Sequence, residues 1–148
     1  MKNILVILAC FFLITACNKD EKNEQELIEN FIAESEYDFG NPTASGLYYA
    51  IIREGDGGFP DASDFVTVDY EGTLLDGTVF DSSYDRGAPF SFSMAGGVID
   101  GWIEGVKFLN RGSKGVFVIP SDLAYGQTGN ANIEPNTPLF FEIELIDF

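Results

Sequence analysis

The amino-acid sequence predicts an α+β fold in which a curved antiparallel β-sheet wraps around one short α-helix. Three observations support this prediction. Short runs of alternating apolar and polar residues recur from residue 46 to the C-terminus, and Asp76-Gly77 between two of them is a strong hairpin signal. A single segment around Trp102 has helical spacing instead. Many strands with one helix are typical of proteins in which a helix covers one face of an antiparallel sheet.

The strands are predicted from these runs in chain order. Residues 47–52 form a β-rich run, and residues 66–74 alternate so that every second side chain faces one side. Residues 90–94 alternate again, whereas residues 116–119 are apolar at every position, as expected for a central strand. The last run, residues 139–148, alternates apolar residues with acids.

Two helices are predicted, one inside the domain and one before it. We expect Asp100 to cap the first, whose apolar side comprises Trp102, Ile103, Val106 and Leu109. The second covers about residues 24–35 in an acidic linker, residues 18–45, that precedes a domain spanning 46–148. Its apolar stripe packs either on the domain or on a second copy of the chain, and the pattern leaves both options open.

Composition excludes several classes of function. The chain of 148 residues contains no histidine, and its two cysteines, Cys10 and Cys17, lie near the N-terminus. Ser-His-Asp and Cys-His catalysis are therefore excluded, as are zinc sites built on His or paired Cys. The net charge of −16 argues against a nucleic-acid partner, which needs a basic face. We expect no metal and no cofactor.

Residues 1–17 have the composition of a signal peptide. Lys2 precedes an apolar run, residues 4–16, that is shorter than the ~20 residues a membrane-spanning helix needs. Ile14-Thr15-Ala16-Cys17 resembles the lipobox of bacterial lipoproteins, which implies that Cys17 carries acyl chains and binds the membrane through them. The alternative is an ordinary signal peptide with an incidental cysteine. The lipobox predicts a lipid-anchored protein of the cell envelope, on the periplasmic face of the outer membrane or on the cell surface.

Cleavage before Cys17 would make the chain more negative. It removes one lysine and no acid, so the net charge changes from −16 to −17. Anionic headgroups repel such a chain, and one acyl chain binds weakly, so stable anchoring needs several chains. Residues 18–21 (Asn-Lys-Asp-Glu) are similar to a surface-export signal of some Bacteroidetes lipoproteins, although a solvated polar linker has the same composition.

Six sequence blocks from residue 68 onward carry a family resemblance. They are residues 68–72 (VDYEG), 76–83 (DGTVFDSS), 86–90 (RGAPF), 98–106 (VIDGWIEGV), 119–126 (IPSDLAYG) and 141–145 (FEIEL). Together they resemble FKBP-type peptidyl-prolyl cis-trans isomerases over about residues 46–148. The resemblance implies an FKBP-like fold, isomerase activity that assists the folding of exported proteins, proline-containing polypeptides as clients and macrolides as inhibitors.

The resemblance also implies the site residues. Trp102 matches the floor under the proline ring, the backbone N–H of Ile99 matches a donor to a substrate carbonyl, and Asp81 and Tyr125 match the polar groups beside the pocket. Arg86 matches a basic residue that pairs with Asp81 and Tyr125. The remaining substrate-binding positions are Tyr70, Phe80, Phe90, Val98, Phe141 and, for an apolar contact at the rim, Ile133. Phe92, Phe117 and Phe140 lack such matches, and we expect them in the core.

This chemistry suits a chain without reactive side chains. Rotation about an X–Pro bond has a barrier of ~20 kcal/mol that arises from amide resonance. An apolar cleft and well-placed hydrogen bonds can favour the twisted amide over both planar forms, with no nucleophile, metal or proton transfer.

Two loops depart from the family pattern. Residues 94–98 and 129–137 are each about one residue shorter, Asn130 stands where many members have histidine, and Glu134 adds a charge. We expect these changes to affect substrate choice and macrolide affinity more than the basic pocket. The alternative function is a chaperone or scaffold module with little turnover in an envelope complex such as gliding machinery. The full aromatic set favours activity, and the oligomeric state is not predicted.

Overall fold

The computed structural model of the chain describes residues 18–148, and the predicted leader with Cys17 lies outside the described residues. In chain order the elements are α1 (Asn18–Glu34), β1 (Tyr48–Arg53), β2 (Phe65–Leu74), β3 (Val79–Ser82), α2 (Ser83–Arg86), β4 (Phe90–Ser93), α3 (Asp100–Gly105), the 3-10 helix η1 (Val106–Phe108), β5 (Lys114–Ile119), the 3-10 helix η2 (Ser121–Leu123) and β6 (Leu139–Asp147). None of the helices within residues 18–148 has the length and apolar character needed to cross a membrane.

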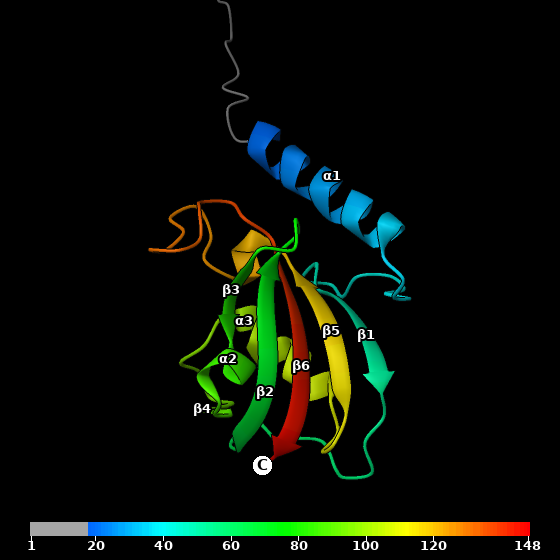
Figure 1. The fold of residues 1–148 in the computed structure, drawn as a ribbon. Helices are drawn as coiled ribbons and strands as arrows, with labels where there is room; N and C mark the ends of the chain where they lie inside the picture. Colours follow the sequence, from blue (N-terminus) through cyan, green and yellow to red (C-terminus); the bar gives the residue numbers. More distant parts are fainter. Residues whose placement is uncertain (1–17) are drawn as a thin grey trace, which may run out of the picture.

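Six strands form one antiparallel sheet, which confirms the predicted fold class. The strand order is β1-β5-β6-β2-β3, and β4 also pairs with β2 (Figure 1). β5 lies between β1 and β6, and a separate hydrophobic cluster covers each of its two faces. Val116 and Val118 face one side, Phe117 and Ile119 face the other, and all four are fully buried. The prediction of a central strand at residues 116–119 is therefore correct.

The free edge of β2 pairs with two short strands in succession, first β4 and then β3. α2 interrupts this edge, and the hydroxyl of Ser83 takes the place of a strand: it accepts from the N–H of Tyr70 at 2.9 Å and donates to Asp69 at 2.7 Å. Ser82 caps α2 by accepting from the N–H of Asp85. Sequence reasoning missed α2 because four residues are too few for a helical period. Its local signals are this cap and Gly87, which ends the helix in the left-handed conformation.

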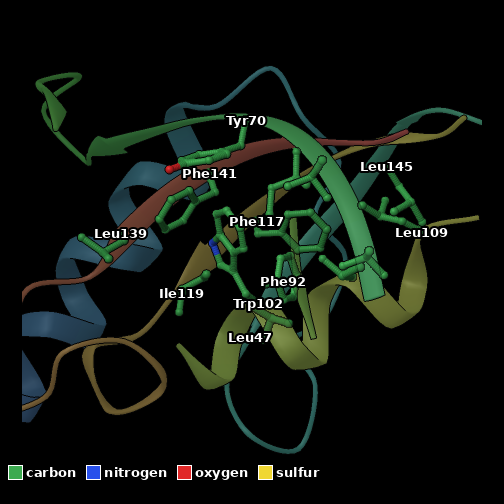
Figure 2. Packing of buried hydrophobic residues seen from close by; sticks show 14 of the residues in the cluster. Leu47, Tyr70, Phe92, Trp102, Leu109, Phe117, Ile119, Leu139, Phe141 and Leu145 are labelled. Carbon is green, nitrogen blue, oxygen red and sulfur yellow. The ribbon is translucent and has the colours of Figure 1, made fainter. Parts of the chain in front are cut away.

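α3 packs against the concave face of the sheet (Figure 2). Trp102 of α3 and Val106 of η1 join the main hydrophobic cluster with residues of β2, β5 and β6. The prediction that Asp100 caps this helix is wrong. Ile99 is the N-cap, with extended backbone, and Asp100 already lies in the first helical turn, with no side-chain capping bond. The negative charge of Asp100 still lies at the favourable end of the helix dipole.

α1 and the chain after it cover part of the opposite face of the sheet (Figure 1). Ile28 and Phe39, which are 1% and 4% exposed, pack with Val116 and Val118 in a second hydrophobic cluster. The helix begins at Asn18, earlier than the predicted residue 24, because the first turns are too polar to show an apolar stripe. Its stripe packs on the sheet of its own chain, the first of the two options left open above.

Candidate active site

A cavity of about 220 Å³ lies between the concave face of the sheet and α3. Its walls bring together segments that are far apart in the sequence. It is lined by Tyr70, Phe80, Asp81, Phe90, Gly97, Val98, Ile99, Trp102, Tyr125 and Phe141. The structure therefore gathers nine of the eleven residues predicted for the pocket, all except Arg86 and Ile133, and adds Gly97.

Trp102, the only tryptophan of the chain, forms the floor of the cavity. It is 4% exposed and packs edge-to-face with Tyr70 and Phe141, with ring centroids 4.7 and 5.3 Å away. Such T-shaped pairs are favoured because the positive edge of one ring meets the negative face of another. The indole N–H has no hydrogen-bond partner among the described residues. It is buried among aromatic rings, which offer only weak acceptors.

The aromatic walls depend on a glycine. Phe80 of β3 and Phe141 of β6 meet edge-to-face at 5.5 Å, directly over Gly72 of β2. A Cβ atom at this position would lie 2.8 Å from Cζ of Phe80 and 3.1 Å from Cδ1 of Phe141. Sequence reasoning did not single out Gly72. Its signal is a glycine in the inward-facing register of β2, two residues after Tyr70, where a packed side chain is expected.

The polar side of the cavity is a three-residue network. Asp81 accepts hydrogen bonds from the hydroxyl of Tyr70 and from the guanidinium of Arg86. Arg86 also donates to the Tyr70 hydroxyl at 2.9 Å and lies 5.3 Å from the centroid of its ring. The expected partners of Arg86 were Asp81 and Tyr125, and the second is wrong. Arg86 ends α2, which packs along β2 and hence near Tyr70, whereas Tyr125 lies in the β5–β6 loop.

Both tyrosine hydroxyls of the cavity are donors at neutral pH. Burial, together with the hydrogen bond to Asp81, raises the pKa of Tyr70 to about 12. Burial, followed by the negative charge of Asp81, also raises the pKa of Tyr125 above its usual value. The Tyr70 hydroxyl donates to the charged Asp81, whereas the side-chain partner of the Tyr125 hydroxyl is the neutral Asn130, so Tyr125 is the hydroxyl that turns more easily to a ligand.

The corner before α3 supplies a backbone donor. The carbonyl of Ile99 accepts from the N–H groups of Trp102 and Ile103. The N–H of Ile99 has no acceptor within residues 18–148, and the residue lines the cavity. Gly97 precedes this corner with φ of 97°, a left-handed conformation that glycine adopts readily. The pair Gly96-Gly97 was the available sequence signal for its place in the wall.

Ile133, predicted at the rim, is placed elsewhere. It is 2% exposed and belongs to the main hydrophobic cluster, not to the cavity lining. Asn130 folds this loop back on itself: its side chain accepts from the N–H of Ile133 at 2.9 Å, and its own N–H donates to the Ile133 carbonyl. Of the three phenylalanines expected in the core, Phe92 and Phe117 are buried and Phe140 is partly buried.

Together, the sheet and its aromatic cavity are suited to hold a small apolar ring and to offer hydrogen bonds beside it, and the lining residues include no nucleophile such as Ser or Cys. The sequence profile of the FKBP-type peptidyl-prolyl cis-trans isomerases matches residues 57–146. The chain belongs to this family.

Individual relatives agree with this assignment. FkpA of Escherichia coli K12 is 46% identical over 129 residues, which are 86% of this chain and 46% of FkpA. The crystal structure of Escherichia coli FkpA superposes with a TM-score of 0.77 at 44% identity and covers 86% of this chain and 58% of that one. FK506-binding protein 1 of Dictyostelium discoideum is 48% identical over 105 residues, 70% of this chain and 98% of its own length. This chain thus spans about half the length of its FkpA relatives.

Proposed function

We propose that this protein is a peptidyl-prolyl cis-trans isomerase that acts on proline-containing polypeptides. The observation that carries the proposal is the cavity, which has a tryptophan floor, aromatic walls and a small set of polar groups. A prolyl ring fits such a lining because its apolar surface is removed from water there. The family membership and the relatives named for this activity support the same conclusion.

The mechanism follows from which groups the cavity presents. The prolyl ring packs on Trp102, and the free N–H of Ile99 donates to a carbonyl next to the bond that rotates. The hydroxyl of Tyr125 is a second donor. A twisted amide loses its resonance and is less polar than a planar one, so an apolar cavity favours it over both planar forms. These interactions lower a barrier of ~20 kcal/mol only in so far as they are stronger in the twisted state.

The test is isomerisation of a Leu-Pro or Phe-Pro peptide by a chain that begins at Asn18 and so keeps every described element. We expect acceleration by wild type and, because each of the two substitutions removes a hydrogen bond of about 1 kcal/mol, a roughly 30-fold lower kcat/KM for Asp81→Ala combined with Tyr125→Phe. Tyr84→Phe is the matched control, because Tyr84 is 48% exposed and lies outside the cavity lining. Peptide binding without acceleration by wild type would leave only the chaperone or scaffold function.

We further propose that the protein is held in the bacterial cell envelope by acyl chains on Cys17 and assists the folding of exported proteins there. The supporting observations are the apolar run and the lipobox-like Ile14-Thr15-Ala16-Cys17. Neither residues 1–17 nor their modification lie in the described part of the chain.

The proposed lipid anchor can be tested by a single substitution at Cys17. In a bacterial host, the wild-type chain should incorporate a labelled fatty acid and sediment with membranes, and Cys17→Ala should do neither. Cys10→Ala is the matched control, because the lipobox contains only Cys17. Membrane retention of the Cys17 variant would overturn the proposal, and protease treatment of intact cells would distinguish the cell surface from the periplasmic face.

A further inference from the structure

Over residues 23–34 of α1, the face that contacts the domain includes the charged residue Glu24. Glu24, Ile28 and Phe31 follow each other at helical spacing on this face. Ile28 is 1% exposed, and the ring of Phe31 lies 5.3 Å from that of Phe140 in β6. These apolar contacts dock the helix and bring Glu24 to the segment that follows β5.

Glu24 binds a single residue of that segment, Ser121, through both carboxylate oxygens. Oε1 accepts from the backbone N–H of Ser121 at 2.5 Å, and Oε2 accepts from its hydroxyl at 2.7 Å. Ser121 is only 3% exposed, so water has little access to these two donors. Hydrogen bonds to a charged acceptor are stronger than neutral ones, and buried donors left without a partner are unfavourable.

The remaining polar group of Ser121, its carbonyl, organises the turn that carries Tyr125. It accepts from the N–H of Ala124 at 2.9 Å and from the N–H of Gly126 at 2.8 Å. Tyr125 lies between these two donors and lines the cavity. One residue therefore connects α1, through its donors, to the cavity wall, through its acceptor.

α1 also faces the far end of the same loop. A second hollow, of about 250 Å³, separates the helix from the loop and is lined by Asn23, Glu24, Leu27, Pro135 and Asn136. The N–H of Asn136 donates to the carbonyl of Gly126, so this end of the loop is joined to the turn that holds Tyr125. In Figure 1, the loop before β6 lies next to the N-terminal half of α1.

We propose that Glu24 is a positioning residue for the cavity: by holding Ser121, it sets the place of Tyr125 and thereby the affinity for substrate. Its kinetic consequence rests on the isomerase function proposed above, whereas its structural consequence does not. Glu24 lies outside residues 57–146, the part that matches the family profile, so the common domain does not supply this contact. Through α1, the N-terminal part of the chain acts on the site.

The experiment compares Glu24→Ala, Glu24→Gln and Ser121→Ala in the full chain with Glu26→Ala, a matched control at an exposed position of the same helix. Four quantities are measured: KM and kcat for a prolyl test peptide, its Kd from the fluorescence of Trp102, amide hydrogen exchange of Ala124 and Gly126, and the thermal midpoint. For Glu24→Ala we expect Kd and KM to rise about three- to tenfold with kcat changed less, and faster exchange at both amides. Glu24→Gln keeps one acceptor oxygen, so its Kd, KM and exchange rates should lie between those of wild type and Glu24→Ala. The control Glu26→Ala should behave as wild type.

The outcomes separate this proposal from its alternatives. A lower thermal midpoint with unchanged Kd and unchanged exchange at Ala124 and Gly126 would show that Glu24 only stabilises α1, and the proposal would fail. Should Glu24→Ala not fold, Glu24→Gln and Ser121→Ala decide by the same criteria. Absence of isomerisation by wild type would refute the isomerase function alone, because exchange and peptide binding still test the link from Glu24 to Tyr125.

Discussion

Tyr70 combines three roles in the site. Its ring packs on Trp102, its hydroxyl donates to Asp81, and it accepts a hydrogen bond from Arg86. Its backbone N–H is held by Ser83 at the break in the sheet edge, so the residue is restrained at both ends. The hydroxyl can donate to Asp81 only while it keeps its proton. The stability of the protein should therefore depend on pH in the alkaline range.

We predict that Tyr70→Phe makes stability less sensitive to pH between about 10 and 12. The Tyr70 pKa is about 12 in the folded protein and 10.0 ordinarily, so over this range the unfolded chain loses a proton that the folded chain keeps. Fewer protons bound to the unfolded state means that stability falls as pH rises, by about 2 kcal/mol for this group. Other tyrosines contribute equally to both proteins and cancel in the comparison.

Urea unfolding at several pH values from 9 to 12 measures this difference. At pH 9 the variant should already be less stable, by about 2 kcal/mol, because two hydrogen bonds of about 1 kcal/mol each, to Asp81 and Arg86, are lost. The gap between wild type and variant should then narrow as pH rises. A gap that stays constant to pH 12 would show that Tyr70 titrates as an ordinary tyrosine.

Among the elements, α1 departs most from what the sequence suggests. Its composition is that of an acidic tether, yet Ile28 is as buried as the central strands are. The chain that follows α1 adds Phe39 to the same cluster, and Tyr37 stacks on Phe140 with 6.1 Å between ring centroids. The helix is therefore held by the sheet and not by its own helix propensity, as is usual for a helix of this length.

We predict that Ile28→Ala lowers the free energy of unfolding by about 2–4 kcal/mol, because it removes a fully buried side chain and leaves a cavity against Val116 and Val118. Leu27→Ala is the matched control, since Leu27 is 48% exposed and its loss should change stability by less than about 0.5 kcal/mol. Denaturant unfolding of the two variants measures both values. Equal, small effects would mean that α1 is not docked in solution.

The sequence predicts most elements and most of the cavity. The features that it does not predict depend on individual hydrogen bonds and not on a repeating pattern of residues. Strands follow from alternation and the cavity from blocks of residues that recur in a family. α2 and the turn that buries Ile133 depend on side-chain hydrogen bonds made by Ser82, Ser83 and Asn130. Such bonds leave no period in the sequence. The contact between Glu24 and Ser121 joins residues 97 positions apart and is invisible to any local pattern.

At the scale of the whole molecule, negative charge dominates. The net charge is −16, and the four cations Arg53, Arg86, Arg111 and Lys114 already pair with acids. The excess of acidic residues extends to the site: Asp100 lines a third hollow, which adjoins the cavity and shares Val98, Ile99 and Tyr125 with it. Under the proposed function, a peptide residue next to a bound proline would therefore lie in a negative potential.

This potential predicts a preference for basic clients that depends on salt. Of two prolyl peptides that differ only in a flanking Lys or Glu, the Lys peptide should have the higher kcat/KM, by about threefold or more at low ionic strength. At about 0.5 M salt the ratio should approach one, because screening shortens the reach of exposed charges to a few ångströms. Asp100→Asn, which removes no capping bond, should lower the ratio at low salt only. A ratio that is the same at both salt concentrations would mean that the flanking residue is recognised by shape or direct contact, and not by the charge of the molecule.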